Sequence, residues 1–293
     1  MKARKRADKR TEDTGWKITW KRFRRHKAAL TGAVCLSVIC VLCVFISLVR
    51  MKDPYQIDVY KRFVVPGAQG FIFGTDELGR DIFSRVFYAG RISLAVGIFT
   101  ALISVFIGST FGIVSGYYGG RTDSAMMRFT DVILTFPPTF LLLILAAFVG
   151  TSLLSIILII SLTRWMPVAR IVRSEVLSLK RRDFVVADIA VGCSDLHIIF
   201  KTLLVNVMAP ILIAMTLTVA EAILIESTLS YLGYGIQPPT ATWGNMLNQA
   251  QSYFSKAPWL AFFPGALITI TVVSVNFIGD GLRDSIDPRL RNA

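Results

Sequence analysis

Residues 92–116 read ISLAVGIFTALISVFIGSTFGIVSG, a run of 25 residues that contains no charged side chain. A helix needs about 20 apolar residues to cross the hydrocarbon core of a bilayer, and this run is long enough. The whole chain has the same character, because 54% of its 293 residues are hydrophobic and only 17% are charged. The sequence therefore predicts an all-α membrane protein and not a soluble domain.

Five other apolar runs lie on the two sides of this stretch. The six predicted transmembrane segments are 28–49, 92–116, 132–149, 153 to about 168, 207–231 and 258–279. The fourth is interrupted by Arg164, whose charge costs about 2.5–3.5 kcal/mol at the centre of a membrane helix on insertion scales. The first is longer than the apolar core of a signal peptide, and no small-x-small cleavage site follows it, so we expect it to remain as an anchor.

Basic residues are distributed unevenly between the predicted loops. With the N-terminus inside, the segments 1–27, 115–130, 169–205 and 280–293 contain 23 of the 32 Lys and Arg residues, and the outside segments contain 8. Cytoplasmic loops carry the excess of positive charge, so both termini are predicted to be cytosolic. Residues 1–27 alone contribute +9 of the net charge of +13, which indicates a membrane anchor and not a nucleic-acid-binding surface.

These segments divide the chain into five parts. They are a basic cytosolic tail (1–27), a first transmembrane helix (28–49), an extracytoplasmic segment (50–91), a five-helix membrane domain (92–279) and a cytosolic C-terminal tail (280–293). In the extracytoplasmic segment, the apolar pairs 82–83 and 86–87 have the spacing of a short interfacial helix. Arg80 and Arg85 lie close to Asp76 and Asp81, so this stretch is also predicted to be a charge-paired surface helix.

Two further polar segments are too long to be simple turns. Residues 231–257 are predicted to lie outside, with tryptophan side chains at the bilayer surface. Residues 170–206 are predicted to lie inside and mix charged and apolar residues at helical spacing. A membrane protein needs no amphipathic segment of this length unless another protein docks there, so we expect a docking surface within it.

The sequence lacks the motifs of the common enzyme classes. It has no nucleotide-binding P-loop, no HExxH metal motif and no GxSxG nucleophile motif. Three of the four cysteines lie within the first apolar run at spacings that match no zinc motif, and only two histidines are present. We therefore expect no catalytic site, no metal and no cofactor in this chain, and the energy for transport must come from an ion gradient or from a partner subunit.

Ionisable residues inside the predicted spans are few and therefore informative. Arg164 lies about 11 residues past Leu153 and Glu221 about 11 residues past Pro210, which places both near the middle of the bilayer. They indicate either a polar translocation path or an ion pair in the bundle interior, and the sequence alone leaves both open. Glu226 lies nearer the outer face, where a role in a path or gate is the preferred interpretation.

Several short strings occur in a fixed order over residues 70–291. They include GTDELGRD (74–81), GRISL (90–94), GYYGG (116–120), QPP (237–239), WGNML (243–247), GDGLRD (279–284) and DPRL (287–290). With these strings the chain resembles the inner-membrane permease subunits of ABC importers for peptides and nickel, in particular the second permease of dipeptide and oligopeptide systems. The resemblance implies the type I transmembrane domain of such importers, with six transmembrane helices and a cytosolic coupling helix.

The same resemblance implies a set of partners. A second, similar permease would complete the channel, and two cytosolic ATP-binding subunits would dock on residues 170–206. A solute-binding protein would dock from outside on residues 53–84 and 231–257. The complex would lie in the cytoplasmic membrane of a prokaryote and import peptides at the cost of ATP hydrolysed in the partner subunits.

In this family the coupling helix carries a Glu-Ala-Ala motif followed by a glycine. The corresponding stretch is VADIAVG at residues 186–192. Its Val186 stands in place of the usual glutamate and Asp188 in place of the second alanine, so Asp188 is a candidate to replace the missing charge. Thr202 and Val205 stand where the family usually has His and Pro. The resemblance implies that the residues that couple to the ATPase are Ala187, Asp188, Ala190, Gly192, Asp195 and Pro210.

Three alternatives remain open at this stage. Within the family, nickel or another small solute could be the cargo. The chain could also be an ion-coupled secondary carrier, although no clear internal repeat is visible. An intramembrane enzyme is disfavoured by the missing nucleophile–base pair. Family members usually have small residues at positions 164 and 221, so the joint appearance of Arg164 and Glu221 favours their pairing.

Overall fold

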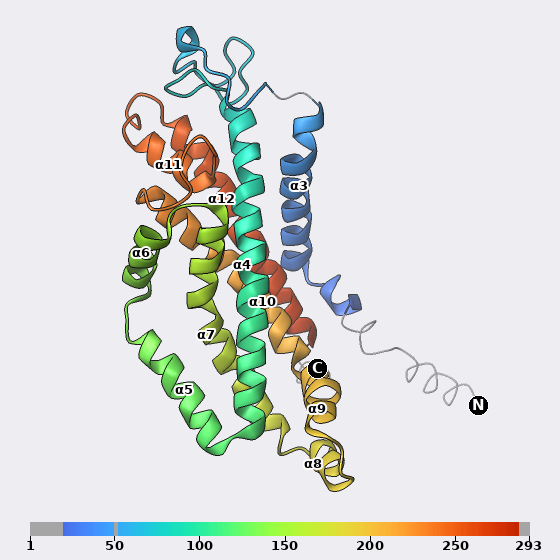
Figure 1. The fold of residues 1–293 in the computed structure, drawn as a ribbon. Coiled ribbons are helices and arrows are strands. Elements are labelled where there is room, and N and C mark those ends of the chain that lie inside the picture. Colours follow the sequence, from blue (N-terminus) through green and yellow to red (C-terminus); the bar gives the residue numbers. More distant parts are fainter. Residues whose placement is uncertain (1–19, 50–51, 287–293) are drawn as a thin grey trace, which may run out of the picture.

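A computed structural model describes residues 20–49 and 52–286, and in this part of the chain it consists of helices and connecting loops without a named strand (Figure 1). The long helices are α3 (Lys27–Val49), α4 (Ile82–Tyr118), α5 (Gly120–Leu134), α6 (Pro138–Val149), α7 (Leu153–Leu179), α10 (Leu204–Tyr231) and α12 (Trp259–Ile286). The short ones are η1 (Val59–Lys61), α8 (Asp183–Ala190), α9 (Asp195–His197), the π-helical stretch η2 (Ile198–Leu203) and α11 (Trp243–Gln251).

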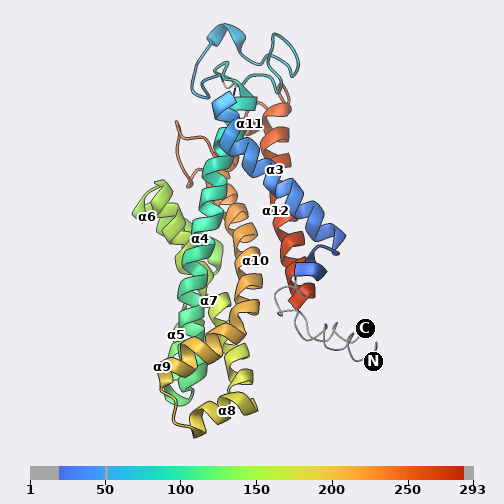
Figure 2. The ribbon, with the colours of Figure 1, turned by 90° about the vertical axis from the view of Figure 1, so that its right-hand side faces the viewer.

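The bundle has two distinct ends (Figures 1 and 2). The end that carries residues 52–81 and α11 is called the platform end, and the end that carries α8 and α9 is called the loop end. Helix α4 connects the two, since it begins at the platform end and finishes at the loop end. Its 37 residues make it about 55 Å long. The hydrocarbon core of a bilayer is about 30 Å thick, so α4 extends well beyond it.

Helices α4 and α7 pack closely along a seam of glycines. Gly108, Gly112 and Gly116 recur every fourth residue on one face of α4, which is the small-xxx-small pattern of close membrane helix pairs. A Cβ atom on Gly112 would lie 2.5 Å from the carbonyl oxygen of Ala169 on α7. The absence of side chains on α4 therefore brings the two backbones together, and the pair forms the centre of the bundle.

A second buried region lies at the platform end. Trp243 at the start of α11 is fully buried, and its Nε1 donates a hydrogen bond of 2.8 Å to the carbonyl oxygen of Val86 in α4. Gly90 leaves room for the indole, because a Cβ there would lie 2.8 Å from the ring. The stacked rings of Phe73 and Phe263, 3.8 Å apart, join the platform loop to α12.

The sequence predicts six membrane spans, and the structure contains five or six candidates. Five segments are each long and apolar enough to cross a membrane, and the bent pair α5–α6 is a candidate for the sixth. Helix α7 runs to Leu179 without a break at Arg164 and therefore includes the first ten residues of the predicted docking segment 170–206. The outer segment 231–257 contains α11, which begins with the capping box of Thr242 and Asn245.

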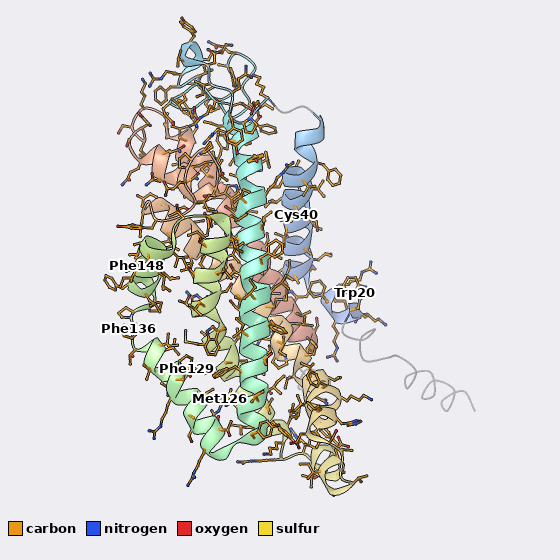
Figure 3. All side chains as sticks on the ribbon, in the orientation of Figure 1. Trp20, Cys40, Met126, Phe129, Phe136 and Phe148 are labelled. Carbon is orange, nitrogen blue, oxygen red and sulfur yellow. The ribbon has the colours of Figure 1, made fainter. Side chains whose placement is uncertain are left out.

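The predicted third span, 132–149, is not one continuous helix. The structure divides it into the end of α5 and the whole of α6, which are bent by 81° relative to each other. Pro137 and Pro138 explain the break, since proline has no N–H to donate and disfavours helical geometry in the residue before it. Helix α6 packs on α7, while Phe136 and Phe148 point outward at the left edge of the bundle (Figure 3).

The predicted interfacial helix at 82–87 is instead the first part of α4. Asp81 caps this helix, because its carboxylate accepts from the backbone N–H of Ser84 at 3.0 Å. The charged stretch before it is paired as predicted, with Arg80 Nε 2.6 Å from Asp76 Oδ2, but it is a buried loop and not a surface helix. Arg85, which suggested a solvent-exposed helix, is buried 3.5 Å from the same carboxylate.

Candidate functional site

The loop end contains most of the residues predicted to couple the chain to a partner. After α7 ends at Leu179, the chain forms α8, turns at Gly192 and returns through α9 and η2 into α10. Figures 1 and 2 show α8 at the lower end of the bundle and α9 above it, at the height of the lower part of α4. Lys180 ties this loop to the end of α4, because its Nζ donates to the carbonyl oxygen of Tyr117 at 2.5 Å.

Gly192 ends helix α8 with a turn that requires a left-handed backbone. Its φ is +82°, a value that side-chain-bearing residues rarely adopt. Its N–H donates to the carbonyl oxygen of Ile189 at 3.1 Å, and the N–H of Cys193 donates to that of Asp188 at 3.0 Å. This pair of hydrogen bonds is the Schellman arrangement of a helix C-terminus. Gly192 therefore fixes the angle at which the chain leaves α8.

Helix α8 is attached to the bundle at two points. Val185 is fully buried in a cluster of apolar side chains from α4, α7, η2 and α10. Asp188 accepts a hydrogen bond of 2.7 Å from the hydroxyl of Thr202 in η2. Both Asp188 and Thr202 depart from the family pattern, and the structure shows that they contact each other. The carboxylate of Asp188 is thus engaged within the chain.

The opposite side of α8 is apolar and exposed. Ala187, Ala190 and Gly192 are exposed, together with Phe184, Val186, Ile189 and Val191. Val191 retains 84% of its accessible surface. Large apolar side chains gathered on an exposed short helix mark an interaction surface, and here they surround the position where the family usually has glutamate. We call these seven residues the α8 face.

Asp195 connects the other side of the loop to α4. Its Oδ1 accepts a hydrogen bond of 2.6 Å from the hydroxyl of Tyr117, one residue before the last residue of α4. Nearby, Arg173 of α7 pairs with Asp123 of α5 at 2.5 Å. Lys180 and Asp195 therefore both tie the loop to Tyr117 at the end of α4, while the Arg173–Asp123 pair joins α7 to α5.

Pro210 lies apart from the other predicted coupling residues. It is inside α10, about two turns beyond η2, and contributes no N–H to the helix. The structure does not bring it to the α8 face. Sequence reasoning missed Tyr117 and Lys180, although the string GYYGG and the basic run 180–182 marked the two segments that meet here.

Arg164 and Glu221 lie in contact, as the pairing hypothesis requires. Arg164 Nη1 of α7 is 3.3 Å from Glu221 Oε2 of α10. The two side chains retain 25% and 53% of their accessible surface, so the pair lies on a face that the chain itself leaves open. Neither residue touches the loop end, and the pair forms a second, separate candidate site within the membrane-spanning part.

Glu226 lies one and a half turns further along α10 but in a different environment. Its side chain is fully buried and accepts hydrogen bonds from Ser230 at 2.7 Å and Ser93 at 3.3 Å. The same Ser93 hydroxyl accepts from the backbone N–H of Trp243 at 3.2 Å. This network joins α4, α10 and α11 at the platform end, and it is closed to the surface of the chain.

The platform loop is held by short-range polar contacts. Lys61 pairs with Asp58 at 2.7 Å, and this hydrogen bond lowers the pKa of the Asp58 carboxyl below its ordinary value. Trp259 Nε1 donates to the carbonyl oxygen of Thr75 at 3.4 Å and so links the loop to α12. Among the described residues, no group of three or more His, Cys, Asp or Glu side chains is placed to hold a metal ion.

These features define a class of protein. It is a multi-pass helical membrane protein with an exposed apolar helix, α8, at one end, a structured platform at the other and an open polar pair between them. A family model described as the binding-protein-dependent transport system inner membrane component matches residues 108–292, and the chain belongs to this family. Residues 14–66 match a second model, the N-terminal TM domain of oligopeptide transport permease C.

Curated relatives match almost the whole chain. The oligopeptide transport system permease protein OppC of Bacillus subtilis is 38% identical over 276 residues, which cover 94% of this chain and 90% of the relative. The dipeptide transport system permease protein DppC of the same organism is 41% identical over 273 residues, covering 93% and 85%. The OppC protein of Haemophilus influenzae is 39% identical over 280 residues, covering 94% and 89%.

Proposed function

We propose that this chain forms one half of the translocation channel of an ATP-driven importer for peptides. The observation that carries the proposal is the α8 face, an exposed apolar surface on a short helix that is fixed to α4, α7 and α10. Such a helix is suited to receive a force from a docked protein and to pass it to the bundle. The partner is an ATP-binding subunit, since this chain has no nucleotide-binding motif of its own.

The partly exposed ion pair between Arg164 and Glu221 supports a second permease as a further partner. Arg164 and Glu221 lie inside apolar helices, and a charge that faces lipid is strongly unfavourable. Their exposed side must therefore face protein or water. A second permease of the same type packed against this face would cover the pair or enclose it in an aqueous path between the two chains.

The distribution of basic residues supports an orientation of the chain with the loop end in the cytosol. Most basic residues lie at the loop end and in the N-terminal segment, which places both on the cytosolic side by the positive-inside rule. The platform end then faces outward, where residues 52–81 and α11 are available to a solute-binding protein. Both termini are cytosolic in this orientation, and the membrane is the cytoplasmic membrane of a prokaryote.

Transport then proceeds by alternating access. ATP closes the two ATP-binding subunits, and the coupling helices follow because each is docked on one of them. The rigid links from α8 to the long helices convert this motion into a change of the side to which the channel is open. The names of the relatives, which are oligopeptide and dipeptide permeases, support peptides as the cargo.

The decisive experiment is purification of the tagged chain from its native membrane, followed by reconstitution into liposomes. We expect two ATP-binding subunits and a second permease to co-purify, and ATP-dependent uptake of a labelled di- or oligopeptide when the solute-binding protein is added. Gly192→Pro removes the N–H and the positive φ that end α8 and is expected to abolish uptake. Gly192→Asn, which tolerates a left-handed backbone, is the matched control and should retain it.

Two results contradict the proposal in different ways. Transport by the chain alone, driven by an ion gradient and insensitive to Gly192→Pro, would establish an ion-coupled carrier. ATP-dependent uptake of Ni²⁺ that peptides do not compete with would keep the ABC permease and replace its cargo.

A further inference from the structure

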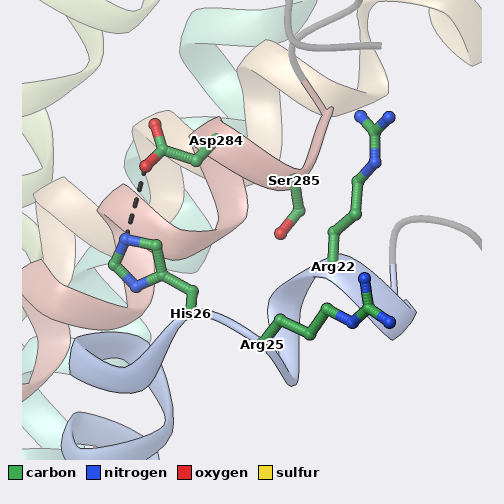
Figure 4. Close-up of a pocket in the computed structure, with 5 residues that line it drawn as sticks. All are labelled: Arg22, Arg25, His26, Asp284 and Ser285. Atoms are coloured by element: carbon green, nitrogen blue, oxygen red, sulfur yellow. Dashed lines mark ion pairs between the residues drawn. The ribbon is translucent and has the colours of Figure 1, made fainter. Parts of the chain in front are cut away.

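A cavity lies where the N-terminal segment meets the end of α12. Its volume is about 300 Å³, and it is lined by Arg22, Arg25, His26, Asp284 and Ser285. Figure 4 shows the first three on the turn that precedes α3 and the last two on the final turns of α12. The cavity lies outside the loop that carries α8 and α9 and apart from the Arg164–Glu221 pair. Neither of those sites includes its lining residues.

The two helices are brought together by a close contact beside this cavity. Gly281 of α12 packs on Ala29 of α3, and a Cβ on Gly281 would lie 2.2 Å from that of Ala29. His26 completes the junction, since its Nδ1 accepts from the backbone N–H of Ala29 at 3.1 Å and its Nε2 lies 3.3 Å from Asp284 Oδ2. The cavity is therefore framed by a packed junction and not by two independent segments.

The electrostatics of the cavity favour an anion. Asp284, the one acid in the lining, is engaged by His26. In the described part of the chain, no ion pair is formed by Arg22 or Arg25, which line the cavity from the turn before α3. Two guanidinium groups on one turn provide the forked donors that suit a phosphate group.

The position of the cavity selects a lipid as the source of this phosphate. Helix α3 begins at Lys27 and its apolar run at Ala28, so the arginines lie just outside the hydrocarbon, at the level of the headgroups. Trp20 is exposed and stacked on Phe23 with ring centroids 5.9 Å apart, as expected for an aromatic pair at the membrane surface. The cavity lies at the level of the headgroups in either orientation of the chain.

The surface of α3 next to the cavity is suited to acyl chains. Exposed apolar side chains continue along this helix from the cavity toward the platform end; they are Leu30, Val34, Val38 and Val41. We propose that this cavity binds the phosphate headgroup of an anionic phospholipid, with Arg22 and Arg25 as its donors and α3 as the support for its acyl chains. The bound lipid joins α3 to the end of α12.

Native mass spectrometry of the full-length protein with added phosphatidylglycerol tests this proposal. Arg22→Gln with Arg25→Gln is expected to weaken binding of the lipid about thirtyfold, because each substitution removes the charge-assisted hydrogen bonds of one guanidinium group to the phosphate. Lys21→Gln with Arg24→Gln removes the same charge from the same turn, outside the cavity, and is the matched control. It should reduce the affinity by less than about threefold if the site is specific, because charges outside the cavity act on the phosphate only through screened attraction.

Three outcomes would overturn the proposal. Equal loss of phosphatidylglycerol in both double variants would show a diffuse electrostatic attraction without a site. Displacement of the lipid by inorganic phosphate would assign the cavity to free anions. Binding of phosphatidylcholine as tightly as phosphatidylglycerol would remove the role of the arginines. Because all four substitutions are on the surface, circular dichroism of each variant is expected to match the unmodified protein.

Discussion

Asp188 and Thr202 are joined by a hydrogen bond of 2.7 Å across the turn that separates α8 from η2. At both positions the family usually has another residue, an alanine and a histidine. The structure shows that the two departures belong together, because the new carboxylate and the new hydroxyl meet. This hydrogen bond holds α8 to η2, and it requires both the carboxylate of Asp188 and the hydroxyl of Thr202.

Thr202→Val removes the hydroxyl donor while preserving the shape of the side chain. We expect α8 to open more readily, with hydrogen exchange of residues 183–193 about fivefold faster, because a hydrogen bond of this kind contributes about 1 kcal/mol. Hydrogen exchange measured by mass spectrometry checks this. Thr202→Ser retains the hydroxyl and should behave like the unmodified protein. Unchanged protection in Thr202→Val would show that Val185 alone holds the helix.

The contact between Arg164 and Glu221 predicts rescue by charge exchange. Arg164→Glu and Glu221→Arg should each lower thermal stability and uptake, since each places two like charges 3–4 Å apart in an apolar segment. The double variant restores opposite charges and should recover about 1 kcal/mol or more of the combined loss. The double-mutant cycle is measured by thermal unfolding in detergent. Strictly additive losses would show that the two residues act separately.

The glycine seam predicts opposite effects at two helical glycines. Gly112→Ala places a methyl group 2.5 Å from a carbonyl oxygen of α7 and should destabilise the protein by about 1–3 kcal/mol. Gly265→Ala on α12 meets only Leu247 at 3.9 Å and should stabilise it by up to about 1 kcal/mol through helix propensity. Melting temperatures of the two variants test the seam. Equal shifts in one direction would contradict it.

Glu221 and Glu226, the two glutamates of α10, should contribute differently to the stability of the fold. Glu226→Ala leaves Ser93 and Ser230 without their acceptor in a closed site and should destabilise the protein by about 1–3 kcal/mol. Glu221→Ala, on an open face, should cost less stability. Thermal unfolding of both variants, with uptake measured beside it, separates the roles. A larger loss of stability for Glu221→Ala would reverse the assignment.

The sequence was sufficient to identify most of the membrane helices and the segment that contains α8 and α9. Apolar runs of 20 or more residues identify membrane helices because few other structures satisfy the backbone in lipid. The break in the third span was harder to predict, since its flanks are as apolar as a continuous helix and only Pro137 and Pro138 mark it. The start of α4 was obscured by Arg85, whose charge is neutralised by Asp76 in a preceding loop.

Most contacts within the candidate site could not be predicted from the sequence and were identified only in the structure. The pairing of Arg164 with Glu221 could be suggested from equal depth in the membrane. That of Asp195 with Tyr117 could not, because 78 residues separate them and no pattern links the two. Asp188 was expected to offer a charge to a partner, whereas the fold directs it to Thr202. The left-handed turn at Gly192 leads the chain back from α8, and Thr202 of η2 then meets Asp188.

Helix α4 begins at the charged platform loop and packs on α7 along its glycines. Near its other end, Tyr117 contacts Asp195 of the loop that carries α8 and α9. A stiff rod of this kind has no internal hinge to absorb a displacement. Tilting it at one extremity displaces the other at the same moment and in the opposite direction. In the proposed alternating-access cycle the outer and inner entrances beside α4 therefore open in turn, and a state in which both are open requires α4 to break.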